Sequence, residues 1–173
     1  MSGASGPERP RADKQVSGAS GPERPRTDNA TAPVPLPRPD PANDDDAHFW
    51  RSLTEGELRI QRCAVCNTFR HPPRPVCAHC GATAREWHAV TGHGDVWSFT
   101  VVHPPTLPAF ADRTPYGAVV VRLDEGVFLV SNVIDCPVDE LAVGLRVECV
   151  LTRIAADPEA GGDYVLPYFR RLG

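Results

Sequence analysis

The sequence lacks a long apolar run. No stretch approaches the roughly 20 consecutive apolar residues that cross a bilayer. The first residues, MSGASGPERPRADK, also lack the apolar centre of a secretory signal. We therefore expect a cytoplasmic protein with no membrane partner.

Lysine is nearly absent, and recognisable catalytic motifs are missing. From Asp44 onward the chain has 12 arginines, no lysine and 17 acidic residues, a balance of −5. Nucleic-acid binders instead collect cations along the phosphate track, so we expect no nucleic-acid partner. The sequence has no His-Glu-x-x-His motif, no Gly-x-Ser-x-Gly motif and no glycine-rich phosphate loop. For His103, before two prolines, a packed or solvated role is favoured over ligand contact.

The first 43 residues are rich in proline and poor in large apolar residues. They contain nine of the 19 prolines, and the segment SGASGPERPR occurs at residues 2–11 and again at 17–26, as in a duplicated linker. Such a chain buries too little apolar surface to offset its ordering entropy. We predict a disordered tail over residues 1–43, a helix and metal-binding segment over 44–90, and a barrel over 91–173.

A short helix is predicted to begin near Asp44. Three successive aspartates suit a helix N-terminus, where free N–H groups and the macrodipole favour negative charge. Phe49, Trp50 and Leu53 form one apolar stripe, and Gly56 is a plausible end.

The rest of the chain is predicted to be mainly β. The segment 58–62 alternates apolar and polar residues, and five further segments carry strand patterns: 96–102, 118–123, 127–134, 146–154 and 164–170. Asp124-Glu125-Gly126 predicts a tight hairpin connection, and 138–143 a short helical turn. Five strands without a long helix predict a small closed or nearly closed barrel.

Six cysteines without a secretion signal favour metal ligation over disulfides. Cys63, Cys66, Cys77 and Cys80 follow the spacing C-x2-C-x10-C-x2-C, which supplies the four tetrahedral thiolates that Zn2+ prefers. Four thiolates leave no open position, so the zinc is predicted to be structural. An iron–sulfur centre and a redox dithiol are the alternatives.

The other cysteines, and the histidine within the motif, are assigned simpler roles. His79 lies inside the second Cys-x-x-Cys and is interpreted as a bystander, because the cysteine pairs already complete the shell. Cys136 and Cys149 have no partner motif and are interpreted as buried thiols that act as small apolar residues.

These features occur together with specific flanking residues. They are Phe49-Trp50, Gly56-Glu57-Leu58, the first cysteine pair, HPPRPVC over 71–77, Glu86-Trp87 and GHGDVWSFT over 92–100. In this combination the chain from about Asp44 to Gly173 resembles the acyl-CoA-associated zinc-ribbon plus OB-fold family, long filed as a domain of unknown function. The resemblance implies a rubredoxin-like zinc ribbon after the helix and a five-stranded OB-fold barrel.

The resemblance also implies a function. Members of this family are usually not catalysts by themselves and occur beside thiolase-like enzymes, or fused to or beside hot-dog-fold hydratases. The resemblance implies an accessory subunit that helps a thiolase-like, lipid-transfer-type partner to bind or channel acyl-CoA thioesters. For this chain it implies a non-catalytic but required component of an acyl-CoA lyase (aldolase), active in retro-aldol cleavage of a steroid side-chain CoA ester. Support of a hot-dog-fold hydratase or of hydroxymethylglutaryl-CoA synthesis is the alternative. Single-stranded nucleic-acid binding by the barrel, and a stand-alone zinc hydrolase or lyase, are less favoured.

Six residues are candidate contacts for CoA or the partner. Exposed apolar loops often mark a binding surface, and the connection 103–116 carries several apolar residues in a turn-like segment. Arg74 suits a CoA phosphate, with a surface salt bridge as the alternative. The candidates are Arg74, Leu107, Phe110, Tyr116, Tyr168 and Phe169.

Overall fold

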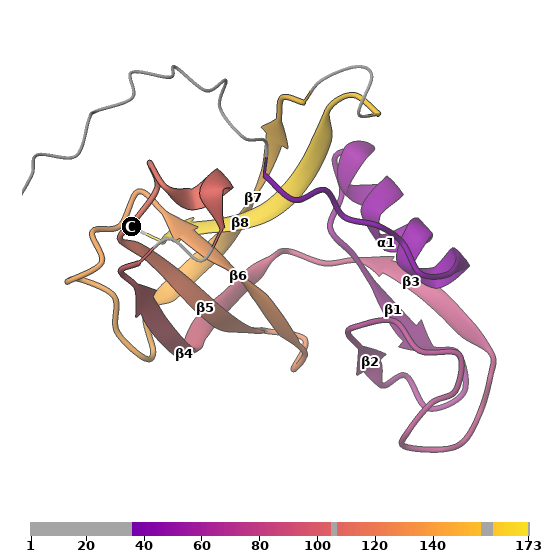
Figure 1. Ribbon diagram of the computed structural model, residues 1–173. Helices are drawn as coiled ribbons and strands as arrows, with labels where there is room; N and C mark the ends of the chain where they lie inside the picture. Colours follow the sequence, from indigo (N-terminus) through magenta and orange to yellow (C-terminus); the bar gives the residue numbers. More distant parts are fainter. Residues whose placement is uncertain (1–35, 105–106, 157–160, 173) are drawn as a thin grey trace, which may run out of the picture. The chain divides into compact units, whose positions relative to one another are not determined.

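The protein was analysed as a computed structural model that describes residues 36–104, 107–156 and 161–172. One helix precedes a small sheet and a barrel (Figure 1). The elements are α1 (Asp44–Thr54), β1 (Arg59–Cys63), β2 (Phe69–Arg70), β3 (Arg85–Ala89), β4 (His93–Val102), the 3-10 turn η1 (Pro108–Phe110), β5 (Tyr116–Leu123), β6 (Phe128–Ile134), β7 (Arg146–Ile154) and β8 (Tyr164–Arg171). Among the described residues, no helix has the length and apolar content needed to span a membrane.

The predicted helix is confirmed as α1. Asn43 caps it, because the side-chain oxygen accepts hydrogen bonds from the N–H groups of Asp45 and Asp46, each at 3.0 Å. The apolar stripe buries Phe49 and Leu53. Gly56 follows the helix at φ +91°, a conformation that favours glycine and turns the chain into β1.

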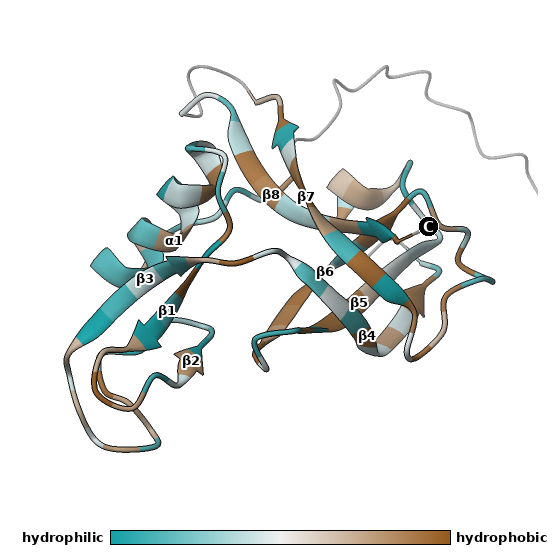
Figure 2. Cartoon of the chain, turned by 180° about the vertical axis from the view of Figure 1, so that it is seen from behind, coloured by the Kyte–Doolittle hydropathy of each residue, from teal (hydrophilic) through white to brown (hydrophobic). Residues whose placement is uncertain are grey.

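The metal-binding segment contains a three-stranded antiparallel sheet in the order β2-β1-β3. The sequence predicted only β1. The strand β2 has two residues, and β3 is exposed or half-buried along its length, so neither carries the alternation that marks a half-buried strand. In Figure 2, β3 is largely hydrophilic, whereas β5 and β6 are largely hydrophobic.

The five predicted barrel strands are confirmed, and they close in the order β4-β5-β6-β8-β7. All neighbours are antiparallel except β6 and β8, which are parallel. A β-bulge interrupts the pairing of β4 with β5 between Val96 and Ser98, which bends the strand as barrel closure requires. The predicted hairpin joins β5 to β6, with Gly126 at φ +82°.

The predicted helical turn over 138–143 is wrong. The segment forms two separate turns, in which Glu140 N–H donates to Pro137 O and Leu145 N–H to Ala142 O. Leu141 is buried, and it approaches Gly117 so closely that a Cβ at that glycine would lie 2.2 Å from Leu141 Cδ1. Leu141 lies between the two turns and belongs to the apolar core with the barrel residues.

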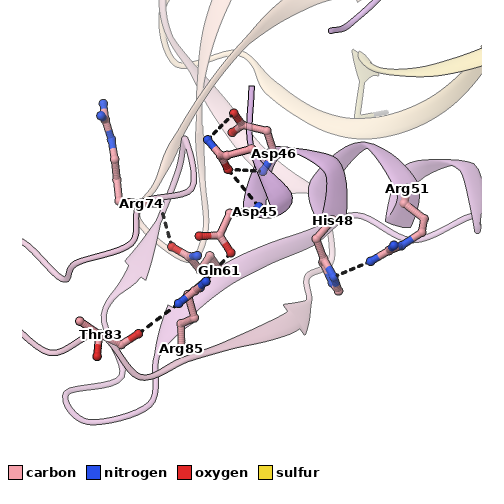
Figure 3. Close-up of polar contacts among 9 residues, drawn as sticks. Asp45, Asp46, His48, Arg51, Gln61, Arg74, Thr83 and Arg85 are labelled. Atoms are coloured by element: carbon pink, nitrogen blue, oxygen red, sulfur yellow. Dashed lines mark hydrogen bonds and ion pairs between the residues drawn. The ribbon is translucent and has the colours of Figure 1, made fainter. Parts of the chain in front are cut away.

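One apolar core joins α1, the small sheet and the barrel. Phe49 and Leu53 of α1 and Ile60 of β1 belong to the same buried cluster as Val121 and Phe169 of the barrel. The helix packs against both β1 and β8. Figure 3 shows a polar contact at the first turn of the helix, where Arg85 of β3 donates to Asp45 at 2.8 Å.

Packing extends N-terminal to the predicted start at Asp44. Leu36 is buried, and the Tyr164 hydroxyl donates to its carbonyl at 3.0 Å. Arg38 donates to Gly162 O at 2.6 Å. Residues 36–43 are therefore anchored to the hairpin that joins β7 and β8. The predicted disorder of residues 1–35 lies outside the described residues.

Candidate metal centre and contact cavities

The four predicted ligands come from two turns with the same local structure. In the first, Asn67 N–H donates to Cys63 O and Cys63 N–H to Thr68 O. In the second, Gly81 N–H donates to Cys77 O and Cys77 N–H to Ala82 O. The residue after each second cysteine has positive φ, +62° at Asn67 and +76° at Gly81. Each turn therefore directs two sulfurs to the same side of the backbone.

The two turns bring all four sulfurs together. The Sγ atoms of Cys63, Cys66, Cys77 and Cys80 lie within 4.8 Å of one another. The Cys63–Cys80 and Cys66–Cys77 separations are both 3.6 Å, too long for a disulfide. Tetrahedral thiolates about 2.3 Å from Zn2+ would be about 3.8 Å apart, so the spacing of the four sulfurs suits such an ion.

The electrostatics of the cluster favour thiolates that share a cation. Hydrogen bonds from the Thr68 side chain and backbone lower the pKa of Cys66 to about 5. The Ala82 N–H also lowers the pKa of Cys80. Hydrogen bonds with the sulfurs of Cys66, Cys63 and Cys77, together with burial, outweigh this and raise the pKa to about 12. One thiolate therefore resists ionisation beside the others unless a cation compensates the charge, as a bound metal does.

The helix and the small sheet position the metal-binding turns. Cys63 ends β1 and is fully buried. Figure 3 shows Gln61, two residues earlier on β1, accepting a hydrogen bond from the Arg74 N–H at 2.9 Å, which fixes the loop between the two turns. His79 lies within the second turn and is exposed.

A second site gathers three predicted contact residues. Phe110, Tyr116 and Tyr168 line one cavity of about 130 Å3, together with Arg113, Asn132, Val133 and Ile134. The rings of Phe110 and Tyr116 are stacked with centroids 5.3 Å apart. Burial raises the pKa of Tyr168 while Arg113 opposes the rise, so the phenol stays protonated at neutral pH. The cavity therefore combines aromatic faces, a cation and a hydroxyl donor.

The remaining contact candidates lie elsewhere. Arg74 is exposed on the loop between the cysteine turns and lines a different cavity. Leu107 is 47% exposed but does not line the aromatic cavity. Phe169 is 0% exposed, so its prediction as a contact is wrong: neighbours on a strand face opposite ways, and Phe169 points into the core.

Sequence reasoning missed Arg113 and Asn132 in the aromatic cavity, and the exposed pair Trp97 and Phe128 on the barrel. Asn132 donates to Gly117 O at 2.8 Å, and its strand pattern gave no sign of a ligand-facing role. The Trp97 and Phe128 rings are 5.5 Å apart, although they are distant in sequence. Trp97 lies within β4 and Phe128 begins β6, so the pair forms only when the strands assemble.

Two family models match the chain. The "ChsH2, rubredoxin-like zinc ribbon domain" matches residues 50–85, and the "ChsH2, C-terminal OB-fold domain" matches residues 87–152. These matches confirm the predicted ribbon and OB fold.

Curated relatives fall into two groups by length. A "DUF35 domain-containing scaffold protein" of Methanocaldococcus jannaschii is 32% identical over 69% of this chain and 83% of its own length. The "Probable enoyl-CoA hydratase alpha subunit" of Thermomonospora curvata is 42% identical over 77% of this chain. The chain spans only 40% of the length of that second relative.

Solved structures show the same fold. A chain of the "Ltp2-ChsH2(DUF35) aldolase" is 39% identical, with a TM-score of 0.66 over 78% of this chain and 98% of that one. A DUF35-family protein from Sulfolobus solfataricus, 13% identical over 75% of this chain and 87% of its own, has a TM-score of 0.53 and shares the fold. The protein is therefore a member of the DUF35 family, with a zinc ribbon and an OB-fold domain of the ChsH2 type.

Proposed function

We propose that the chain is an accessory, non-catalytic subunit that binds a thiolase-like, lipid-transfer-type enzyme and helps it to hold acyl-CoA thioesters. The complex would act as a lyase in retro-aldol cleavage of a steroid side-chain CoA ester. The observation that carries the proposal is the match to a chain of the "Ltp2-ChsH2(DUF35) aldolase", which this chain covers over 98% of its length. A whole-chain match supports a similar role more strongly than a shared motif does.

We propose a structural rather than a catalytic role for the metal centre. The cysteine cluster has four sulfurs around one point and offers no open coordination position. Outside it, no group of three or more described histidines, cysteines or carboxylates lies close enough to hold a metal. We propose that the ion is Zn2+ and that it stabilises a segment too small to fold on its own core.

The aromatic cavity is the proposed contact with the acyl-CoA or with the partner next to it. Phe110 and Tyr116 offer stacked rings, and Arg113 offers a cation with no ion pair among the described residues. Aromatic rings with a few convergent polar groups are typical of small-molecule sites. Leu107, exposed one residue before η1, extends the apolar surface toward the same loop.

Reconstitution tests the proposal. The zinc-loaded chain is mixed with an Ltp2-type thiolase-like protein, complex formation is measured by light scattering, and cleavage of a steroid side-chain CoA ester is followed by chromatography. We expect a stable complex and cleavage only in the mixture. Equal cleavage by the thiolase-like protein alone would refute the accessory role.

Paired arginine variants test the cavity. Arg113→Ala is expected to lower cleavage at limiting substrate, because it removes the cavity's cation. Arg153→Ala is the matched control, since Arg153 lies on β7, is mostly exposed and pairs with Asp163 at 3.5 Å. Equal activity of the two variants would remove the cavity from the proposal.

Support of a hydratase is the second candidate. A relative in Mycobacterium tuberculosis, 34% identical over 66% of this chain and 36% of its own length, is named "3-oxo-4,17-pregnadiene-20-carboxyl-CoA hydratase alpha subunit". Enoyl-CoA hydration that depends on this chain in a mixture with a hot-dog-fold protein, without aldolase activity, would favour this candidate.

A further inference from the structure

Arg70, the last residue of the edge strand β2, is buried, and no described residue forms a hydrogen bond with its guanidinium. Its side chain is 8% exposed overall, and the Nε, Nη1 and Nη2 atoms form no hydrogen bond with any residue in the described ranges. A guanidinium remains charged at all ordinary pH values. A buried, unpaired charge is among the costliest features of a fold, so an acceptor that the described residues do not supply is expected.

The neighbouring strand does not supply that acceptor. Gln61 of β1 is directly opposite Arg70 in the antiparallel register. Its oxygen already accepts from Arg74 N–H, and its Nε2 is itself buried without a partner among the described residues. Side chains of directly opposed residues lie on the same face of a sheet. Gln61 therefore does not pair with Arg70, and its own Nε2 also needs an acceptor.

Arg70 and Arg74 line the same cavity, which has a volume of about 300 Å3. The cavity lies between the β2 end of the ribbon and the start of β6, where Gly126, Val127 and Phe128 contribute the opposite wall. None of its lining residues is acidic, although the chain from Asp44 onward carries net negative charge. Its volume is at the lower end of the roughly 300–1,000 Å3 found for small-molecule pockets.

We propose that this cavity binds a phosphate group between the guanidinium groups of Arg70 and Arg74. Two cations match the charge of about −1.5 to −2 that a phosphate monoester carries near neutral pH. The planar fork of arginine binds phosphate oxygens in pairs. The nitrogens of Arg70 are covered in the free chain, so binding turns the side chain toward the cavity and gives the buried charge its partner. The proposal is independent of the accessory role proposed above.

Titration of the zinc-loaded full chain with inorganic phosphate, at constant ionic strength, tests the site. We expect saturable binding by calorimetry and amide chemical-shift changes by NMR at Arg70, Arg74 and Gly126. Arg70→Met and Arg74→Gln are each expected to weaken binding about tenfold or more, since each removes charge-assisted hydrogen bonds. Arg59→Gln is the matched control, because Arg59 lies on β1, pairs with Glu57 and does not line the cavity.

Three results would overturn the proposal. They are no saturable phosphate binding by the wild type, equal binding by the two cavity variants and the control, and acetate binding as tightly as phosphate. Arg74→Gln alters an exposed residue and keeps the test decisive if Arg70→Met fails to fold.

Glu125 is an alternative partner for Arg70. Its Oε2 is buried beside the cavity residue Gly126 and forms no hydrogen bond with any described residue. If Arg70 pairs with Glu125 instead, Glu125→Gln lowers stability and phosphate does not bind, which also refutes the proposal.

Two larger ligands separate the possible sources of the phosphate. Coenzyme A carries a 3′-phosphate that dephospho-coenzyme A lacks. One outcome is that the chain binds coenzyme A more tightly than both dephospho-coenzyme A and inorganic phosphate, and that Arg74→Gln abolishes this difference in affinity. That result would identify the ligand as a phosphate monoester on a larger molecule. Equal affinity for all three would identify a site for free phosphate or any exposed phosphate group.

Discussion

Leu53 is predicted to couple the folding of the ribbon to that of the barrel. It is 1% exposed on α1 and belongs to the apolar core that includes Ile60 of β1 and Phe169 of β8. Leu53→Ala removes buried methyl groups and leaves a cavity where three elements meet. Buried Leu→Ala changes cost about 2–5 kcal/mol, and the almost complete burial of this side chain supports about 3 kcal/mol here.

Denaturant unfolding with three tryptophan reporters measures this effect. Trp50 lies on α1, Trp87 on β3 and Trp97 on β4, so variants that keep one tryptophan report on the helix, the ribbon and the barrel separately. With a urea slope of about 1–3 kcal/mol/M, a loss of about 3 kcal/mol lowers the midpoint by roughly 1–3 M. All three reporters are expected to shift together.

A neighbouring variant is the control for the helix itself. Thr54→Ala alters an exposed residue whose hydroxyl bonds only Trp50 O at 3.3 Å, so a change below about 0.5 kcal/mol is expected. A shift of Trp50 and Trp87 without a shift of Trp97 in Leu53→Ala would refute the coupling, because ribbon and barrel would then unfold independently.

Three further perturbations test the ribbon. Burial lowers the pKa of His71 to about 4, against 6.5 in the unfolded chain. The unfolded state therefore binds more protons between these pH values, and the free energy of unfolding falls by about 3 kcal/mol as the pH drops from 6.5 to 4. His71→Phe should remove this pH dependence of the unfolding midpoint. Gly81→Ala should lower the free energy of unfolding of the zinc-loaded chain by about 1 kcal/mol. A Cβ at this position would meet no atom within 4 Å, but it disfavours the backbone angle φ +76°. Cys63→Ser should reduce zinc measured by mass spectrometry from one ion per chain to none, whereas Cys136→Ser should retain it; equal zinc content would contradict the assigned ligands.

The sequence predicted those elements whose residues repeat with a clear period. The helix was marked by Asp44 and its neighbours and by the stripe through Leu53, and the barrel strands by alternation or β-branched runs. The cysteine spacing sufficed for the metal site, because two short turns determine where the sulfurs lie. These features depend on local geometry, which the sequence encodes directly.

The remaining features depend on contacts between distant segments. The strand β2 exists because Phe69 and Arg70 pair with β1 across the first cysteine turn, not because of a pattern in two residues. Phe110 and Tyr168 meet only after β5, β6 and β8 have closed the barrel. The hydrogen bond from Arg74 N–H to Gln61, the residue opposite Arg70, likewise joins β1 to the loop between the cysteine turns.

The most direct test of the account is the metal dependence of the reconstituted complex. The ribbon is proposed to hold α1 and the barrel in the arrangement that the thiolase-like partner binds. Removal of the metal with a chelator should therefore abolish both complex formation and acyl-CoA cleavage, and added Zn2+ should restore them together. A complex that stays intact and fully active after complete loss of the metal would contradict the account.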